Sequence, residues 1–402
     1  MIRNSAQVNA LSELLSLPEE EKNARGLAHT PAEIAQQPET WLSTFRIFQK
    51  RQAQIADFLS LAGFRADPED RPAVFLVGAG TSDYVGQALS YLLRTRWRCP
   101  VAPVPSTDLL THMDELVTPG KKYLWISFSR SGDSPEGVAV LENARKNWPG
   151  IYHLVISCNA NGRMIRENAG EPQVLSICLD DAVNDRGLAM TSSFSNMLIF
   201  GQALAHVDHP SAYEEVLSHL VRAGEDFLPR AADCAAALAT DSYTKACFVG
   251  SGPLRAVARE SALKLLELTA GKALTMSESA LGLRHGPMAA LDQHTLFIGF
   301  LSGDRRVQHY ELDLLEEIGK KHLVKSRVVV AGSGFPDKDS LAERYLQASV
   351  PVTIADDYRP AVDVIFGQLL GLFFSLRWNL RPDSPSPSGA ISRVVQNVRI
   401  HA

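Results

Sequence analysis

The chain contains the same strand-and-loop segment twice. Tyr123-Leu-Trp-Ile-Ser-Phe-Ser-Arg-Ser-Gly-Asp133 is matched later by Thr295-Leu-Phe-Ile-Gly-Phe-Leu-Ser-Gly-Asp304. Upstream of each lies a second matching pair, Val74-Phe-Leu-Val-Gly-Ala-Gly-Thr-Ser82 and Cys247-Phe-Val-Gly-Ser-Gly-Pro253. A repeat of whole strand-loop-helix units restricts the chain to two copies of one fold. Only the first copy keeps its serines, so we expect one copy to hold a ligand and the other to carry the chemistry.

Each copy alternates short apolar runs with helical stretches. The runs at residues 74–77, 124–128 and 295–300 have the length of buried strands, and a last strand is expected at residues 350–354. This alternation is typical of a parallel sheet with helices on both faces. The predicted fold class is therefore α/β, with two doubly wound three-layer domains in tandem, an N-terminal helical arm and a C-terminal tail.

A length of 402 residues provides enough material for two cores. Apolar residues recur at spacings of three and four before residue 70, which predicts helices there. The expected organisation is an N-terminal helical arm at 1–70, a first domain at 71–210, a linking helix at 211–240, a second domain at 241–380 and a tail at 381–402.

The composition argues against several classes of partner. The formal net charge is -5 and there is no long basic run, so no nucleic-acid partner is expected. No 18 apolar residues run together, and Met1-Ile-Arg-Asn-Ser5 opens a polar stretch without the apolar core of a signal peptide. We therefore expect a cytoplasmic protein with no membrane partner. The five cysteines are scattered and never form Cys-x-x-Cys, which predicts reduced packing residues.

A serine-rich loop in the first copy has the features of an anion site. Residues 127–135 follow a predicted strand and open a predicted helix, where hydroxyls, backbone N–H groups and the positive helix end meet. The same serines could merely cap the helix, but the density of hydroxyls favours a phosphate monoester. The candidate phosphate ligands are Thr81, Ser82, Ser129, Arg130, Ser131 and Ser134.

Nucleotide and metal sites are less well supported. Gly78-Ala-Gly-Thr-Ser-Asp83 lacks the third glycine of a dinucleotide fingerprint, and no Gly-Lys-Ser/Thr of a P-loop occurs. His206 and His209 form a pair without a third ligand pattern. We expect no cofactor and no metal.

The second copy carries the candidate acid and base groups. Glu260, Lys264 and Glu267 share one face of a predicted helix, which places a lysine between two carboxylates. A solvated ion-pair stripe is the alternative for such a face. A loop histidine, His285 on a Gly-Pro turn, beside these carboxylates supplies the acid and base groups that proton transfer requires.

Taken together, these motifs resemble the tandem SIS (sugar isomerase) family over roughly residues 40–380. The resemblance rests on Gly80-Thr-Ser82, Ser129-Arg-Ser-Gly-Asp-Ser134, Glu260-Ser-Ala-Leu-Lys-Leu-Leu-Glu267 and Arg284-His-Gly-Pro287. Residues 184–194 and 386–396 are further similar to the branch of tagatose-6-phosphate ketose/aldose isomerases and galactosamine-6-phosphate deaminases.

The resemblance implies a role for each candidate residue. Ser82, Ser129, Ser131 and Ser134 would hold a sugar 6-phosphate, and Arg130 would replace a glutamine of related synthases. Glu267 would move a proton between C1 and C2, with Glu260 alongside. Lys264 and His285 would handle the sugar hydroxyls and ring opening, and a histidine donated by a neighbouring subunit implies a homodimer or higher homo-oligomer.

Two departures from the synthases narrow the expected reaction. Residues 382–402 contain no lysine that could form a Schiff base, and Ile2 stands where a glutaminase domain has its nucleophilic cysteine. Ammonia from glutamine is therefore not expected. The leading hypothesis is an isomerase and deaminase that converts galactosamine 6-phosphate to tagatose 6-phosphate and ammonia, while a gluco substrate, simple tagatose-6-phosphate isomerisation and a non-catalytic sugar-phosphate sensor stay open.

Overall fold

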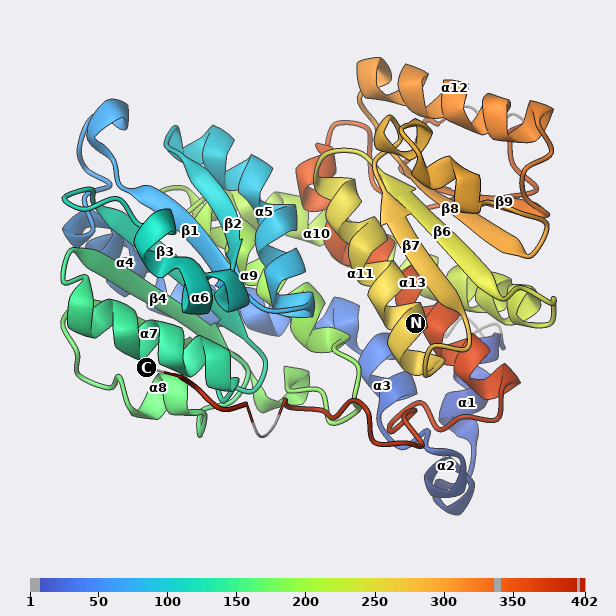
Figure 1. Cartoon of the computed structure of the whole chain (residues 1–402), viewed down its shortest axis with the longest axis horizontal. Coiled ribbons are helices and arrows are strands. Elements are labelled where there is room, and N and C mark those ends of the chain that lie inside the picture. Colours follow the sequence, from blue (N-terminus) through green and yellow to red (C-terminus); the bar gives the residue numbers. More distant parts are fainter. Residues whose placement is uncertain (1–7, 336–340, 396–397, 402) are drawn as a thin grey trace, which may run out of the picture. The chain divides into compact units, whose positions relative to one another are not determined.

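The computed structural model describes residues 8–335, 341–395 and 398–401, so the polar start of the chain lies outside the described residues. The chain divides into two compact units (Figure 1). The first-copy unit comprises Glu39–Asp185, Ser192–Ser218 and Ile391–Ala402. The second-copy unit comprises Met1–Pro38, Arg186–Thr191 and His219–Ala390. This division differs from the expected boundaries because each unit collects separate stretches of chain.

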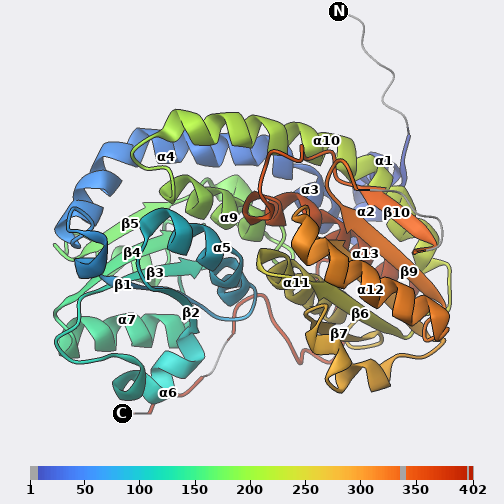
Figure 2. The ribbon, with the colours of Figure 1, turned by 90° about the horizontal axis from the view of Figure 1, so that it is seen from above.

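Five parallel strands form the sheet of the first-copy unit in the order β2-β1-β3-β4-β5. Helices α6 and α7 cover one face, where Phe75 and Trp125 lie in the core, and α4, α5 and α9 cover the other (Figure 2). The bounds are β1 (Ala73–Gly78), β2 (Val101–Pro105), β3 (Tyr123–Ser129), β4 (Ile151–Ser157), β5 (Val174–Cys178), α4 (Gln37–Leu61), α5 (Thr81–Trp97), α6 (Ser106–Leu116), α7 (Pro135–Asn147), α8 (Arg163–Arg166) and α9 (Ser192–Leu204).

The sheet of the second-copy unit repeats this topology. Its order is β10-β9-β8-β6-β7, so each copy places its second strand at an edge beside its first, followed by the third, fourth and fifth. Helix α11 packs on one face and α12 on the other. The bounds are β6 (Lys245–Gly250), β7 (Leu274–Glu278), β8 (Thr295–Leu301), β9 (Ser326–Ala331), β10 (Arg344–Gln347), α1 (Ala10–Ser16), α2 (Glu19–Arg25), α3 (Thr30–Ala35), α11 (Pro253–Leu268), α12 (Arg305–Lys320) and α13 (Pro360–Arg377), while α10 (Pro210–Ala239) runs through both units.

The repeat extends to the backbone of the turn after the first strand of each copy. Gly80 and Gly252 precede α5 and α11 with nearly the same dihedrals, φ 55° and ψ -125° against φ 56° and ψ -128°. A positive φ is inexpensive only for glycine, which explains why both turns use it. The predicted α/β architecture of two helix-flanked parallel sheets with a helical N-terminal region is confirmed.

The strand expected at residues 350–354 is wrong. The fifth strand of the second copy is β10, and the Ile354 N–H instead donates to the Pro351 carbonyl at 3.0 Å in a turn. Pro351 has no N–H to give to a sheet, so an apolar run that contains it makes a poor strand.

Helix α13 forms the core of the second-copy unit. Gly367 and Gly371 face α11, and a Cβ at Gly367 would lie 2.7 Å from the Ser261 Cα, so the two helices are in direct backbone contact. Among the described helices, α13 alone has the length and apolar composition of a membrane span, yet 89% of it is buried within the structure. Such burial is what a core helix shows.

The terminal segments are tied into the second-copy unit by side-chain caps. Asp383 accepts hydrogen bonds from the N–H and hydroxyl of Thr30, both at 2.8 Å, at the start of α3. Asp233 accepts from the Ala10 N–H at 2.8 Å at the start of α1. These contacts explain why the N-terminal helices belong to this unit.

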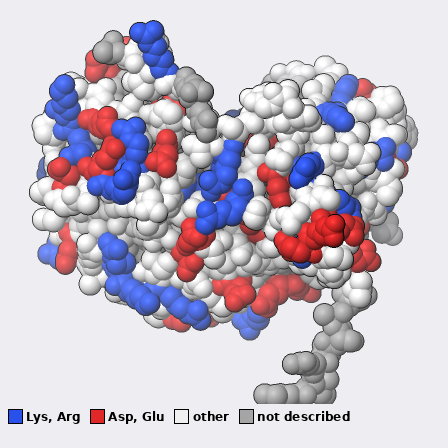
Figure 3. All heavy atoms as spheres, turned by 90° about the horizontal axis from the view of Figure 1, so that it is seen from below, with Lys and Arg blue, Asp and Glu red and all other residues white. Residues whose placement is uncertain are grey.

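The free cysteines agree with the prediction of reduced packing residues. All five cysteines are free, and burial raises the pKa of Cys247 to about 12, so this thiol is not a nucleophile near neutral pH. On the face drawn in Figure 3, basic and acidic side chains are intermingled.

Candidate functional site

The serine loop lies at the point in the first sheet where the strand order reverses. β1 and β3 are neighbours, and β2 lies on the far side of β1. In open parallel sheets of this order, ligands bind between the loops that follow these two strands. Thr81 and Ser82 open α5 after β1, and Ser129 ends β3. The topology thus brings both predicted groups of hydroxyls to one edge of the sheet.

The loop after β3 is fixed by hydrogen bonds among its own residues. Ser129 Oγ accepts from the Gly132 N–H at 3.0 Å, and Ser131 Oγ accepts from the Asp133 N–H at 3.2 Å. Gly132 has φ 65°, and a Cβ there would lie 3.1 Å from the Gly162 Cα, so glycine is required at this position. These contacts fix the conformation of the loop.

The hydroxyls of this loop have different surroundings. Ser82, Ser129 and Ser131 are buried, and among the described residues none of their hydroxyl groups donates to a carboxylate. Ser134 differs: its Oγ accepts from the Gly137 N–H at 3.4 Å and donates to Glu136 at 3.0 Å, so it caps α7. The helix-cap alternative therefore describes Ser134 well, and the other three hydroxyls are the better candidates for anion ligands.

Arg130 is buried and directed at the C-terminal segment. Its guanidinium donates to the carbonyl oxygen of Arg393. The Arg393 guanidinium donates in turn to the Asp185 carbonyl at 2.7 Å and to Asn184 Oδ1 at 2.7 Å. The Asp185 carboxylate caps α9 through the Ser192 N–H at 3.0 Å. Arg130 is therefore held by its own unit.

Arg393 and Asp185 were not predicted as site residues. Both lie in residues 184–194 and 386–396, the two segments that resemble one branch of the family. That resemblance was the sequence feature from which they could have been predicted. The contact between Arg393 and Asn184 joins residues 209 positions apart, so no local pattern reveals it.

The three charged residues predicted on α11 form a compact cluster. Lys264 Nζ lies 2.5 Å from Glu267 Oε2 and 3.4 Å from Glu260 Oε1. The side chains of Lys264 and Glu260 are 1% and 0% exposed, and that of Glu267 is 23% exposed. The alternative of a solvated stripe is wrong. Buried charges are costly unless they are paired, and here one cation is shared by two carboxylates.

The partial exposure of Glu267 sets it apart from Glu260. Its carboxylate is within reach of a ligand, while Lys264 holds it in place from the buried side. A fixed carboxylate beside an ammonium group is suited to take and return a proton. Glu278 ends β7 and pairs at 2.5 Å with Arg255 in the first turn of α11, a contact that was not predicted.

His285 lies outside this cluster. It is exposed on a turn where its N–H donates to the Gly282 carbonyl at 2.9 Å, while the adjacent Arg284 pairs with Glu317 at 2.7 Å. Within the described part of the chain, no hydrogen bond or ion pair joins its imidazole to the α11 cluster. The imidazole is therefore presented to the outside of this chain.

The histidine pair near residue 206 has an ordinary structural environment. His206 is buried against Tyr213, and burial lowers its pKa to about 4. Over the residues that the structure describes, no three His, Cys, Asp or Glu side chains come together as a metal site would require.

Comparison with known proteins places these features in context. The SIS domain profile matches residues 69–207. The chain is 38% identical to a Streptomyces coelicolor protein provisionally named D-galactosamine-6-phosphate deaminase AgaS, over 93% of this chain and 95% of that one. It is 30% identical to the D-galactosamine-6-phosphate deaminase AgaS of Shewanella sp. strain ANA-3, over 96% and 95%. The crystal structure of tagatose-6-phosphate ketose/aldose isomerase from Escherichia coli superposes with a TM-score of 0.83 at 28% identity, covering 93% and 96%.

Proposed function

Because the chain belongs to the SIS domain family and is an enzyme of the phosphosugar isomerase and deaminase kind, we propose that it converts galactosamine 6-phosphate to tagatose 6-phosphate and ammonia. The resemblance inferred from the motifs is confirmed at the level of the family. The deaminase names of relatives that match nearly the whole chain support the amino-sugar substrate.

The observation that carries the proposal is the buried lysine between two carboxylates on α11. Lys264 and Glu260 are almost completely excluded from solvent, and Glu267 is held 2.5 Å from the ammonium group. A protein that only bound a sugar phosphate would not need a partly exposed carboxylate fixed beside this buried ammonium group. Acid and base chemistry on a sugar uses it directly.

The proton steps follow from the chemistry of the substrate. Glu267 removes the C2 proton of the open-chain amino aldose and returns it to C1. The C1 oxygen gains a proton and the amino nitrogen loses one, so this step leaves a C1 hydroxyl and a C2 imine on the nitrogen of the substrate. Lys264 stabilises the negative charge that develops on the C1 oxygen. Water then adds to C2 and ammonia leaves, giving the 2-ketose. No lysine of residues 382–402 is needed, since the imine forms within the substrate.

The serine loop supplies recognition of the 6-phosphate. Ser82, Ser129 and Ser131 offer buried hydroxyls at the N-terminal ends of two helices, where backbone N–H groups also favour an anion. Thr81, Ser134 and Arg130 border them. A phosphate held here would anchor the substrate while its first two carbons react.

Simple isomerisation of tagatose 6-phosphate is the second candidate. The solved structure named tagatose-6-phosphate ketose/aldose isomerase has the same fold over nearly the whole chain. The same Glu267 transfer between C1 and C2 would serve both reactions, and only the C2 substituent differs. Incubation with tagatose 6-phosphate alone, followed by detection of an aldose 6-phosphate, distinguishes this activity.

The deciding experiment measures ammonia release from galactosamine 6-phosphate. We expect turnover by the wild type and a loss of about 100- to 10,000-fold in Glu267→Gln, because general acid-base catalysis contributes on this scale. Glu316→Gln is the matched control, since it removes a carboxylate from the exposed pair with Lys320 on α12. No ammonia from the wild type, or full activity in Glu267→Gln, would contradict the proposal.

We further propose that the enzyme is a cytoplasmic homodimer or higher homo-oligomer in which His285 opens the sugar ring of a substrate bound to the partner subunit. The exposed position of His285, away from the α11 cluster of its own chain, supports this arrangement.

A further inference from the structure

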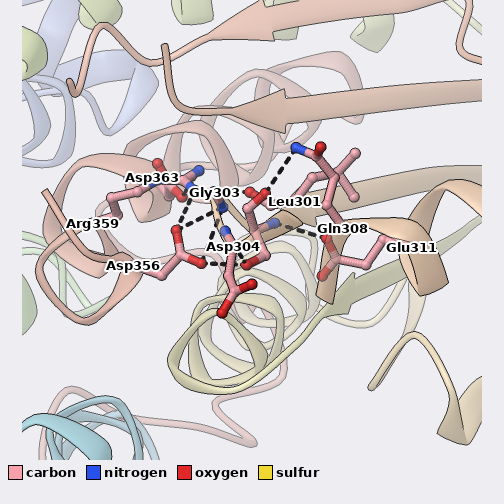
Figure 4. A network of polar contacts seen from close by, with 9 residues as sticks. Leu301, Gly303, Asp304, Gln308, Glu311, Asp356, Arg359 and Asp363 are labelled. Carbon is pink, nitrogen blue, oxygen red and sulfur yellow. Dashed lines mark hydrogen bonds and ion pairs between the residues drawn. The ribbon is translucent and has the colours of Figure 1, made fainter. Parts of the chain in front are cut away.

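The loop after β8 is the second-copy counterpart of the serine loop. The hydrogen-bond donors of this loop bind a carboxylate of the same unit, that of Asp356. Ser302 Oγ donates to Asp356 Oδ2 at 2.5 Å. The Gly303 N–H donates to both carboxylate oxygens of Asp356, at 3.0 and 3.1 Å (Figure 4). A hydroxyl and a backbone N–H that converge on one anionic group form the same kind of site that a phosphate uses.

The two loops share their internal geometry. Ser302 Oγ accepts from the Asp304 N–H at 3.0 Å, just as Ser131 Oγ accepts from the Asp133 N–H at 3.2 Å. The difference lies in the acceptor for the serine hydroxyl. In the second copy the acceptor is Asp356, whereas among the described residues no carboxylate accepts from Ser131.

A second carboxylate, that of Glu311, also accepts a hydrogen bond from this loop. Glu311 on α12 is buried, and its Oε2 accepts from the Ser302 N–H at 2.8 Å. Counted from the loop aspartate, the equivalent position on α7 is Val140, a buried apolar residue. The second copy therefore has a side-chain acceptor at a position where the first copy has an apolar residue.

Arg359 balances these acidic groups and fixes Asp356. Its guanidinium is only 2% exposed, bonds Asp356 Oδ1 at 2.8 Å and Asp363 Oδ2 at 2.8 Å, and donates to the Leu301 carbonyl at the end of β8, also at 2.8 Å. A buried cation at the mouth of the loop is a second element of an anion site. Without Asp356, one arm of this guanidinium would lose its hydrogen-bonded carboxylate, and Glu311 would be the acidic group left at the loop.

We propose that Asp356 is the resident anion of the second loop, so that each chain binds a single phosphate group, in the first loop, and that removing this carboxylate makes the second loop a phosphate site. The ligand class is a phosphate monoester or inorganic phosphate. The single phosphate in the first loop rests on the proposed function, whereas the gain of a phosphate site on removal of Asp356 does not.

The test counts inorganic phosphate bound per chain by equilibrium dialysis. The wild type should bind one equivalent of phosphate, and Ser131→Ala should weaken this binding. Asp356→Ala should bind a second equivalent, and adding Ser131→Ala to this variant should leave the second equivalent unchanged. Asp356→Asn is the matched control. Its amide fills the same space and offers an oxygen to the Gly303 N–H, so it should gain no site.

A thermal measurement covers the case of a destabilised variant. Millimolar inorganic phosphate should raise the melting temperature of Asp356→Ala and Asp356→Ser more than that of the wild type, by mass action on the folded state. The inference is overturned if neither variant binds additional phosphate in dialysis and phosphate raises the melting temperature of neither variant more than that of the wild type. A wild type that binds no phosphate while Asp356→Ala binds one would instead contradict the proposed function.

Discussion

Ser131 and Ser302 occupy the same position in two copies of one loop, yet their partners differ. The Ser302 hydroxyl is bonded to Asp356, while the Ser131 hydroxyl is directed to no acidic group of the described chain. Ser131→Ala should raise KM about 10- to 100-fold, since a hydrogen bond to a charged group contributes about 1.5–3 kcal/mol. Steady-state kinetics on galactosamine 6-phosphate measures this.

Ser302→Ala is the matched control for that substitution. It should lower the free energy of unfolding by about 1.5–3 kcal/mol, because the Ser302 hydroxyl donates to a carboxylate, and leave the activity of the folded enzyme nearly intact. Equal losses of activity in both variants would mean that the two loops have not diverged in role.

His153 should make the fold sensitive to acid. It is fully buried in β4 with both ring nitrogens unbonded among the described residues, and burial lowers its pKa to about 3. Below pH 6.5 the imidazole of His153 takes up a proton in the unfolded chain, whereas in the folded chain it stays neutral down to about pH 3. The free energy of unfolding should therefore decrease by about 1.4 kcal/mol per pH unit in this range.

His153→Leu should remove this dependence on pH, as urea unfolding between pH 7 and 5 would show. His206, with a pKa lowered to about 4, keeps its own contribution, so part of the slope should persist. His112→Gln, at an exposed position, serves as the control and should leave the slope unchanged. An identical slope in His153→Leu would contradict the assignment.

At the scale of elements, the packing of α11 on α13 positions the cluster of Glu260, Lys264 and Glu267. A Cβ at Gly371 would lie 2.9 Å from the Lys264 carbonyl oxygen, and one at Gly367 would contact the Ser261 backbone. Gly367→Ala should lower the free energy of unfolding by about 1–3 kcal/mol, because the helices must separate. Chemical denaturation measures the loss, and the displacement of α11 should reduce kcat.

Gly150→Ala is a suitable control, since a Cβ there has nothing within 4 Å. It should leave both stability and kcat close to those of the wild type. If Gly367→Ala behaves in the same way, the close contact between α11 and α13 is not required.

The sequence predicted the elements where a repeat or a strong period marked them. The two strand-loop-helix units and the face formed by Glu260, Lys264 and Glu267 are local patterns, and the structure contains them. The edge strand β2 was missed because Pro103 and Pro105 interrupt its pattern, and an edge strand tolerates proline. The burial of Lys264 could not be predicted, because it depends on where α13 packs.

At the scale of the whole molecule, the exposed His285 predicts that activity depends on assembly. His285→Ala and Glu267→Gln should each be inactive alone, and mixing them should restore activity if each site combines residues of two subunits. Random exchange between dimers should recover about a quarter of the wild-type rate, because half of the dimers are mixed and one of their two sites is intact. No recovery after verified subunit exchange would place His285 in its own chain's site.

The central claim is that the first copy holds the phosphate and the second copy moves the proton. Deuterium incorporation from heavy water into galactosamine 6-phosphate, measured at saturating substrate, tests it most directly. Ser131→Ala should exchange the C2 proton at nearly the wild-type rate once saturated, whereas Glu267→Gln should still bind the sugar phosphate and exchange at least about 100-fold more slowly. Wild-type exchange in Glu267→Gln would contradict the account.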